Sequence, residues 1–315
     1  MNNRSFHYDQ YRKDAVQNQT VELPLDKFHH DDIEELAALA YGFRQRGEKG
    51  VAVIAPEQKK KWAARKNEDT VLLIVPPHFR QNVPLPKELA RFHQSGSFFQ
   101  FRKLDDTPYV NNVNYWINRL DDLWDRYKEC QKSRTITDFE NHFIKVFPYF
   151  AGLGENAVQY MVDLRLDYSV FEKPAVCHHR FTDDTWAFGP YWIKSPADWV
   201  IDHPSRDLAE WMRGAVLDNK SYQEIESFLQ AYHQENPITS LGKSLIMGRL
   251  LFPLSFIELS EAYFEDKKRN ESLYMDVLLK SLSRMEQYES FLKWFAQENL
   301  AEIKTVDWLV SNVKR

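Results

Sequence analysis

A change in hydrophobic period about a quarter of the way along the chain most constrains what it can fold into. Before that point, the apolar segments at 20–23 and 70–75 are short and end at proline, and an amphipathic segment at 33–43 lies between them. Afterwards, apolar residues recur mainly at helical spacing. A period of two indicates strands and a spacing of three to four indicates helices. The sequence therefore predicts an α+β protein with a small sheet-plus-helix lobe over 1–80 and a large, mainly helical lobe over 81–315.

The composition argues against several classes of protein. The chain has 46 acidic and 41 basic residues and a net charge of −5, so general nucleic-acid binding is not expected. No apolar run approaches the roughly 20 residues that a membrane span requires, and the first residues have no apolar signal core. With only Cys130 and Cys177, no disulfide framework is indicated, and synthesis in the reducing cytoplasm is expected.

Residues able to carry chemistry concentrate between 175 and 213. His178 follows an apolar run, and the hydrophobic segment Trp199–Ile201 ends on Asp202. Asp207 then stands before a short helical pattern, where its side chain is suited to act as an N-cap. The pattern predicts a strand that delivers one carboxylate to its end and a helix that begins at a second.

The order of these elements resembles the aminoglycoside phosphotransferase branch of the protein-kinase-like fold. More specifically, CHHRF, WVIDHPSRDLAEWMR and RLLFPLSFIELSEAYF resemble the YutH group of endospore coat-associated proteins, relatives of the CotS coat proteins. The resemblance implies a bilobal kinase-like fold, association with the spore coat, and other coat proteins as partners. It leaves open the identity of the partner, the coat layer and the oligomeric state.

The resemblance also implies which residues should perform phosphoryl transfer, and most of them are replaced. The family's loop reads His-Gly-Asp, with an Asn five residues after the Asp. His178 keeps the first position, His179 replaces the glycine and Arg180 replaces the catalytic aspartate. Arginine stays protonated in proteins, so it cannot accept a proton from a substrate hydroxyl. Thr185 stands at the position of the metal-binding asparagine.

The remaining parts of such a site are also incomplete. Asp202 matches the metal-binding aspartate and Asp207 matches the aspartate that braces the loop. In the small lobe, Lys27 is the nearest candidate for a phosphate-binding lysine, with Glu34 or Glu35 as its acid, and no glycine precedes Gly42. We therefore expect a pseudokinase that acts as an interaction protein, without catalytic residues, cofactor or bound metal, and with Asp202 as the residual metal-ligand candidate.

Three other interpretations of these residues stay open. Asp183 or Asp184 could supply a displaced base and, with Asp202, make an active small-molecule phosphotransferase. Cys177 and His178 could form a nucleophile pair. A metal site could also be built from imidazole and carboxylate ligands, the candidates being His178, His179, Asp202 and His203.

One pairing is expected if no metal binds. A buried carboxylate at Asp202 is costly without a cation. Arg180, at the position of the catalytic aspartate, could supply a charge-assisted hydrogen bond to it.

Overall fold

The fold comes from a computed structural model, which describes residues 20–55, 70–76, 83–101, 108–168, 172–188, 191–266 and 270–310. The chain separates into two compact units. Unit 1 comprises residues 1–105, 172–214 and 223–238, and unit 2 comprises residues 106–171, 215–222 and 239–315. The expected lobe boundary near residue 80 stays a prediction, and the lysines at 59–61 lie outside the described residues.

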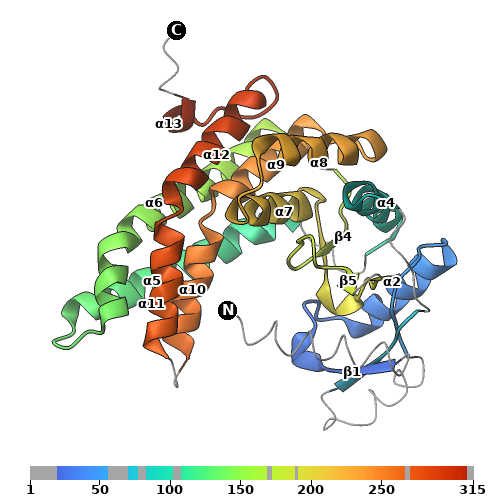
Figure 1. The fold of residues 1–315 in the computed structure, drawn as a ribbon, viewed down its shortest axis with the longest axis horizontal. Helices are drawn as coiled ribbons and strands as arrows, with labels where there is room; N and C mark the ends of the chain where they lie inside the picture. Colours follow the sequence, from blue (N-terminus) through green and yellow to red (C-terminus); the bar gives the residue numbers. More distant parts are fainter. Residues whose placement is uncertain are drawn as a thin grey trace. The chain divides into compact units, whose positions relative to one another are not determined.

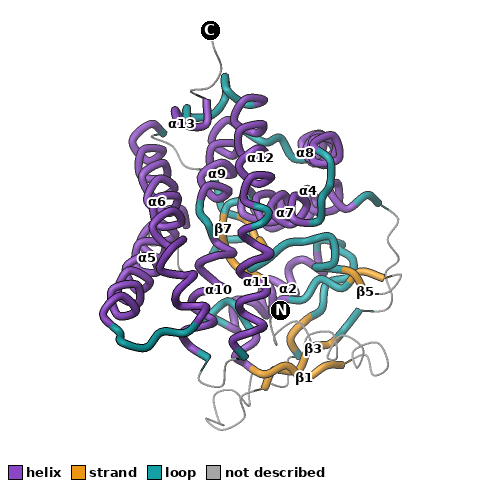
Figure 2. Tube along the Cα trace, turned by 60° about the vertical axis from the view of Figure 1, so that its left-hand side comes forward, coloured by secondary structure: helices purple, strands orange, loops and turns teal. Residues whose placement is uncertain are grey.

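Within the described part of unit 1, three antiparallel strands form a sheet in the order β1-β3-β2 (Figure 2). The strands are β1 (Thr20–Pro24), β2 (Val53–Ile54) and β3 (Thr70–Ile74). Burial alternates along β1 and β3, and along β1 it follows the alternation of polar and apolar residues in the sequence. Helix α2 (Ile33–Gln45) packs against β2 and begins at Asp32, whose side chain accepts a hydrogen bond from the Glu35 backbone N–H.

The rest of unit 1 contains a short antiparallel ribbon made of two strands, β4 and β7. The elements of this part of unit 1 are η1 (Leu25–Lys27), α4 (Leu85–Ser97), β4 (Ala175–His178), β5 (Ala187–Phe188), β6 (Tyr191–Trp192), η2 (Pro196–Asp198), β7 (Trp199–Asp202), and most of α7 (Ser205–Leu217) and α8 (Tyr222–Glu235). Strand β4 pairs with β7, and helix α4 packs on β4 (Figure 1). The contact is close, because a Cβ atom on Gly96 of α4 would lie 2.8 Å from the Val176 backbone nitrogen.

Unit 2 is built from helices. They are α5 (Pro108–Lys132), α6 (Asp138–Asp167), α9 (Ser240–Leu251), α10 (Leu254–Glu265), α11 (Glu271–Leu282), α12 (Met285–Glu298) and α13 (Asp307–Val310). Helices α5 and α6 lie side by side (Figures 1 and 2). Gly154 makes this approach possible, since a Cβ there would lie 2.8 Å from a methyl carbon of Leu120.

Helix α6 runs unbroken through Gly152 and Gly154 and uses Gly154 for packing. Residues 283 and 284 separate α11 from α12. One helix boundary predicted from the sequence is wrong. Helix α7 begins at Ser205, so Asp207 lies in its first turn and is not its N-cap.

In the described residues, no single helix combines the length and hydropathy needed to cross a membrane. Helices α9 and α10 meet the test only as a pair, bent by 42° at their junction. Most residues of α9 are buried in the structure.

Two glycine substitutions should have opposite effects on stability, because only Gly96 lies in the close contact between α4 and β4. Gly96→Ala should destabilise the protein by about 1–3 kcal/mol, because the new methyl group meets backbone that cannot rotate away. Gly152→Ala is the matched control, since it lies in a helix with open space around it. It should stabilise by about 0.5–1 kcal/mol. Chemical denaturation measures both, and a neutral Gly96→Ala variant would contradict the assigned packing.

Candidate functional site

The β4–β7 pair places the residues singled out in the sequence at opposite ends of one ribbon. The register opposes His178 to Trp199 and Ala175 to Asp202. Antiparallel pairing therefore brings the end of β4 to the beginning of β7, and Asp202 leads from β7 into helix α7. His178 and Asp202 are both buried.

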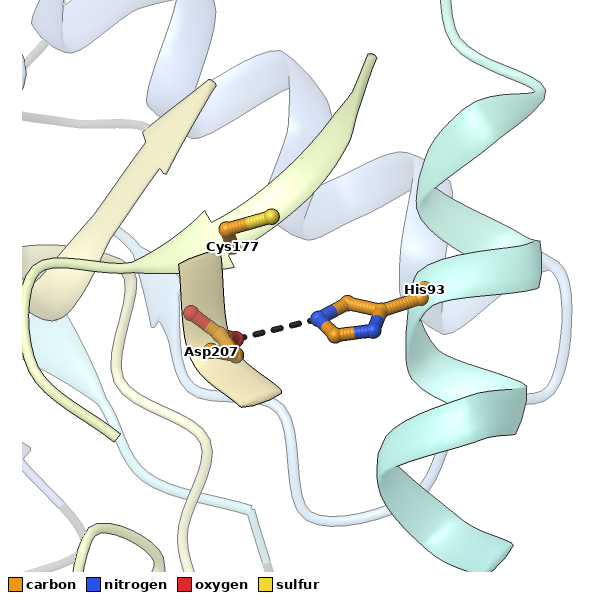
Figure 3. Close-up of side chains that lie close together, drawn as sticks. All are labelled: His93, Cys177 and Asp207. Carbon is orange, nitrogen blue, oxygen red and sulfur yellow. Dashed lines mark hydrogen bonds and ion pairs between the residues drawn. The ribbon is translucent and has the colours of Figure 1, made fainter. Parts of the chain in front are cut away.

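Asp207 is the centre of the site and is fully buried. One of its carboxylate oxygens accepts the backbone N–H of His178 at 2.9 Å. The other lies 2.6 Å from His178 Nδ1 and 3.0 Å from Nε2 of His93, which α4 supplies (Figure 3). The carboxylate thus joins α4, β4 and α7, which are distant in sequence.

The hydrogen bonds fix where the protons lie. Trp186 Nε1 can only donate, and it lies 2.9 Å from His178 Nε2. That nitrogen is therefore an acceptor, and Nδ1 of His178 carries the proton that is donated to Asp207.

The same reasoning applies to His93. Asn236 donates its amide N–H to the Tyr232 hydroxyl at 2.9 Å, and this hydroxyl lies 2.8 Å from His93 Nδ1. We infer that Tyr232 donates to Nδ1 and that His93 Nε2 donates to Asp207. Two series of hydrogen bonds, one that starts at Asn236 and one that starts at Trp186, thus end at the carboxylate of Asp207.

This environment shifts two pKa values in the direction that preserves the network. Burial alone would raise the pKa of Asp207, but electrostatic attraction and hydrogen bonding from His178, together with His93, hold it well below its usual range. Burial lowers the pKa of His93, and the interaction with Asp207 offsets only part of that effect. Asp207 is therefore ionised and His93 neutral near pH 7.

Helix α7 holds the loop after β4 through a second residue, Arg206. Its guanidinium donates to the carbonyl oxygens of His178 at 2.9 Å and His179 at 3.3 Å. It also donates to the Asp202 carboxylate at 3.0 Å. Asp202, Glu210 and Asp207 together raise the pKa of Arg206 despite its burial. Arg206 therefore supplies the positive charge that these buried acids require.

The same face of α7 contacts the next part of the loop. Arg180 lies 3.4 Å from Glu210, which also pairs with Arg213 at 2.5 Å. The pKa of Glu210 is lowered, because the nearby guanidinium groups outweigh the effect of burial. The sequence favoured Arg180 as the partner of Asp202, whereas the structure places Arg206 on Asp202 and Arg180 on Glu210.

The two aspartates proposed as a displaced base lie farther along this loop. Asp183 accepts a hydrogen bond from Trp211 Nε1 of α7 at 2.7 Å, and both Asp183 and Asp184 are exposed. Thr185, which the resemblance aligns with the family's asparagine, accepts a hydrogen bond within the loop from the Thr182 backbone N–H at 2.7 Å. Asp202, the residue with which either aspartate was expected to act, pairs with Arg206.

The structure also contains a buried lysine that the sequence analysis missed. Lys194 Nζ lies 2.6 Å from Glu48 and 2.7 Å from Glu88, and 4.7 Å from the centroid of the Trp186 ring. By contrast, Lys27 lies in η1, 4.0 Å from Asp26. Nothing in the local sequence around Lys194 reveals its burial, because its two acids come from other elements.

The four residues considered together as a metal site have separate partners. His178 bonds to Asp207, His179 stacks on His29 with ring centroids 3.8 Å apart, and Asp202 pairs with Arg206. His203 lies 3.0 Å from Glu172. Among the described residues, a different group brings potential ligand atoms within 4.8 Å of one another, namely His93, Cys177 and Asp207 (Figure 3).

A metal at that group would have to replace existing hydrogen bonds. The oxygen of Asp207 nearest His93 already receives protons from two imidazoles. Cys177 Sγ lies 3.4 Å from the Asp202 carbonyl oxygen. The hydrogen bonds of Asp207 account for this arrangement. The two ring nitrogens of His178, proposed to form a nucleophile pair with Cys177, lie against Asp207 and Trp186.

Helix α7 carried a signal that the sequence analysis did not use. Arg206, Asp207, Glu210 and Trp211 have the spacing of one helical face, and all four contact the end of β4 or the loop that follows it. His93 offered no such signal, since a single histidine in an amphipathic helix has no distinctive spacing.

Comparisons with known proteins show similarity over most of the chain. The family model described as "Spore coat putative kinase YutH" matches residues 2–295. The Endospore coat-associated protein YutH of Bacillus subtilis (strain 168) is 30% identical over 304 residues, covering 91% of this chain and 88% of the relative.

A solved structure shows the fold. The aminoglycoside phosphotransferase from Alicyclobacillus acidocaldarius subsp. acidocaldarius DSM 446 superposes with a TM-score of 0.66 at 13% identity, covering 89% of this chain and 86% of that one. The chain therefore has an aminoglycoside phosphotransferase-like fold with a small N-terminal sheet and a mainly helical remainder, which confirms the predicted fold class.

The convergence of donors on Asp207 predicts a large cost for losing its charge. In Asp207→Asn, the one amide oxygen can face the imidazole N–H groups of His178 and His93 only if the N–H₂ faces the backbone N–H of His178. We expect a loss of about 3–5 kcal/mol in the free energy of unfolding. Asp163→Asn, at a partly exposed ion pair with Lys304, is the control and should change stability by less than about 1 kcal/mol. Equal effects in urea denaturation would contradict the central role of Asp207.

The lowered pKa of His93 predicts a pH-dependent stability. In the unfolded chain this imidazole takes up a proton near its ordinary pKa of 6.5, while in the folded protein it stays neutral to lower pH. Stability should therefore fall as the pH drops below about 6.5, by up to about 1.4 kcal/mol per pH unit for this one group. His93→Gln should flatten this part of the curve. An unchanged slope would show that His93 titrates alike in both states.

Proposed function

We propose that this chain, which belongs to the Spore coat putative kinase YutH family, is a catalytically inactive kinase-like protein that acts as a structural or interaction component associated with the spore coat. The coat association follows from the family and from the similarity to the Bacillus subtilis coat-associated protein. Other coat proteins are then its expected partners.

The observation that carries the proposal is the ion pair between Arg206 and Asp202. Asp202 is the residue that matches the family's metal-binding aspartate, and its carboxylate lies 3.0 Å from the Arg206 guanidinium. A guanidinium at this carboxylate neutralises the charge that would otherwise attract a divalent cation. A magnesium ion therefore does not fit the residues present, and we derive no step that depends on one.

The position of the base supports the same conclusion. Arg180 stands where the family's catalytic aspartate would be, and its side chain carries a permanent positive charge beside Glu210. Phosphoryl transfer requires a base or an orienting group for the nucleophile and cations on the phosphates. Here the guanidinium groups of Arg180 and Arg206 pair with carboxylates of the protein itself, and the loop packs on α7.

An active small-molecule phosphotransferase is the second candidate function. The observation in its favour is the exposure of Asp183 and Asp184 on the same loop, where either carboxylate could reach a substrate. The hydrogen bond from Trp211 to Asp183 gives this residue a structural role as well.

Nucleotide binding separates the two candidates. A ligand that binds only the folded protein stabilises it by about 2.7 kcal/mol at a hundredfold excess over Kd. We expect no magnesium-dependent rise in melting temperature with millimolar ATP, and no heat of binding by calorimetry. A large rise would contradict the pseudokinase proposal. ATP turnover that disappears in Asp183→Asn or Asp184→Asn would instead establish the phosphotransferase.

A further inference from the structure

The exposed ring of Phe98 lies on unit 1 with the half-buried ring of Phe99 and the exposed side chain of Arg46. The aromatic patch consists of Phe98, Phe99 and Arg46. Phe98, which follows α4, is 67% exposed. Burying a phenyl ring from water is strongly favourable, so a ring left this exposed marks a surface that gains free energy when it is covered.

The aromatic patch has a fixed foundation on helix α2. Phe99 packs so closely on Gly42 that a Cβ atom there would lie 2.4 Å from its ring. Its ring also meets the buried ring of Phe43 edge-on, with centroids 4.9 Å apart. Phe99 is therefore held in place before a partner binds, which reduces the entropy lost on binding.

Arg46 gives the patch its charge. Its guanidinium lies 4.9 Å from the ring centroid of Phe98 and 5.4 Å from that of Phe99. The side chain is exposed, and among the described residues these ring contacts are the interactions it makes. Other arginines of the structure have acidic partners, such as Arg119 with Glu261 and Arg126 with Glu129. The N–H donors of Arg46 thus remain available for an external acceptor.

We propose that the aromatic patch docks a segment of a partner protein in which a carboxylate lies beside an apolar side chain. The carboxylate would accept hydrogen bonds from Arg46, and the apolar side chain would cover Phe98. An arginine stacked on aromatic rings keeps its planar fork oriented, and residues of these types dominate binding energy at protein interfaces. The chain's net charge of −5 argues against a nucleic acid as the occupant.

This inference rests on the proposed function, because an interaction protein requires a surface that selects its partner. The docking proposal and the proposed function can fail separately. Nucleotide binding concerns Asp202 and Arg206, whereas Arg46 and Phe98 have no contact with either.

Fluorescence anisotropy with two labelled peptides tests the proposal. The probes are Glu-Glu-Phe-Glu-Glu-Leu and Lys-Lys-Phe-Lys-Lys-Leu, each titrated with the full chain at low ionic strength. We expect binding of the acidic peptide and none of the basic one, with affinity that falls as salt is added. Arg46→Glu and Phe98→Ala should each weaken binding about tenfold or more. Arg46→Lys should recover only part of the affinity, because lysine keeps the charge but not the stacked fork.

Arg126→Glu is the matched control, since Arg126 is also exposed but already pairs with an acid. It should bind the acidic peptide like the parent protein. Melting curves establish that each variant is folded, and Arg46→Gln replaces Arg46→Glu if that variant is not. Absent or charge-independent binding, or equal losses in Arg126→Glu and Arg46→Glu, would overturn the proposal. Self-association that Arg46→Glu abolishes would assign the patch to a second copy of the chain and would also overturn it.

Discussion

The carboxylate of Asp207 is the interaction on which the rest of unit 1 depends. It accepts one backbone and two imidazole N–H groups, and it thereby holds the end of β4 between α4 and α7. An ionised acid can be buried only when its hydrogen bonds are satisfied and a cation is near. His178 and His93 supply the hydrogen bonds, and Arg206 supplies the charge. The proton positions follow from two donors outside this group, Trp186 and the Asn236–Tyr232 pair.

Helix α7 holds the loop after β4 through several side chains. Arg206 bonds to the carbonyl groups at the beginning of the loop, Glu210 pairs with Arg180, and Trp211 bonds to Asp183. Asp207 and the β4–β7 pair join these elements through the protein's own hydrogen bonds. Such a scaffold can serve interaction as well as catalysis, because a fold does not determine a function.

Charged side chains are arranged differently near Asp202 and at the aromatic patch. Near Asp202, guanidinium groups and carboxylates neutralise one another within the protein. At the aromatic patch, Arg46 lies on two phenyl rings and offers its donors outward. The first arrangement stabilises the chain, and the second is suited to recognition of another molecule.

The sequence by itself determined the fold class, the alternation along β1 and the strand that ends on Asp202, because these depend on local pattern. It placed helix boundaries less well, since Gly154 serves a packing contact with Leu120 that no local pattern reveals. Only the tertiary structure decided the partners of the charged groups. Asp207 meets His93 across 114 positions of sequence, Lys194 meets Glu88 across 106, and Arg206 takes the place on Asp202 that residue type alone gave to Arg180. Side-chain pairing between distant elements is set by how those elements pack, and the packing exists only in the folded chain.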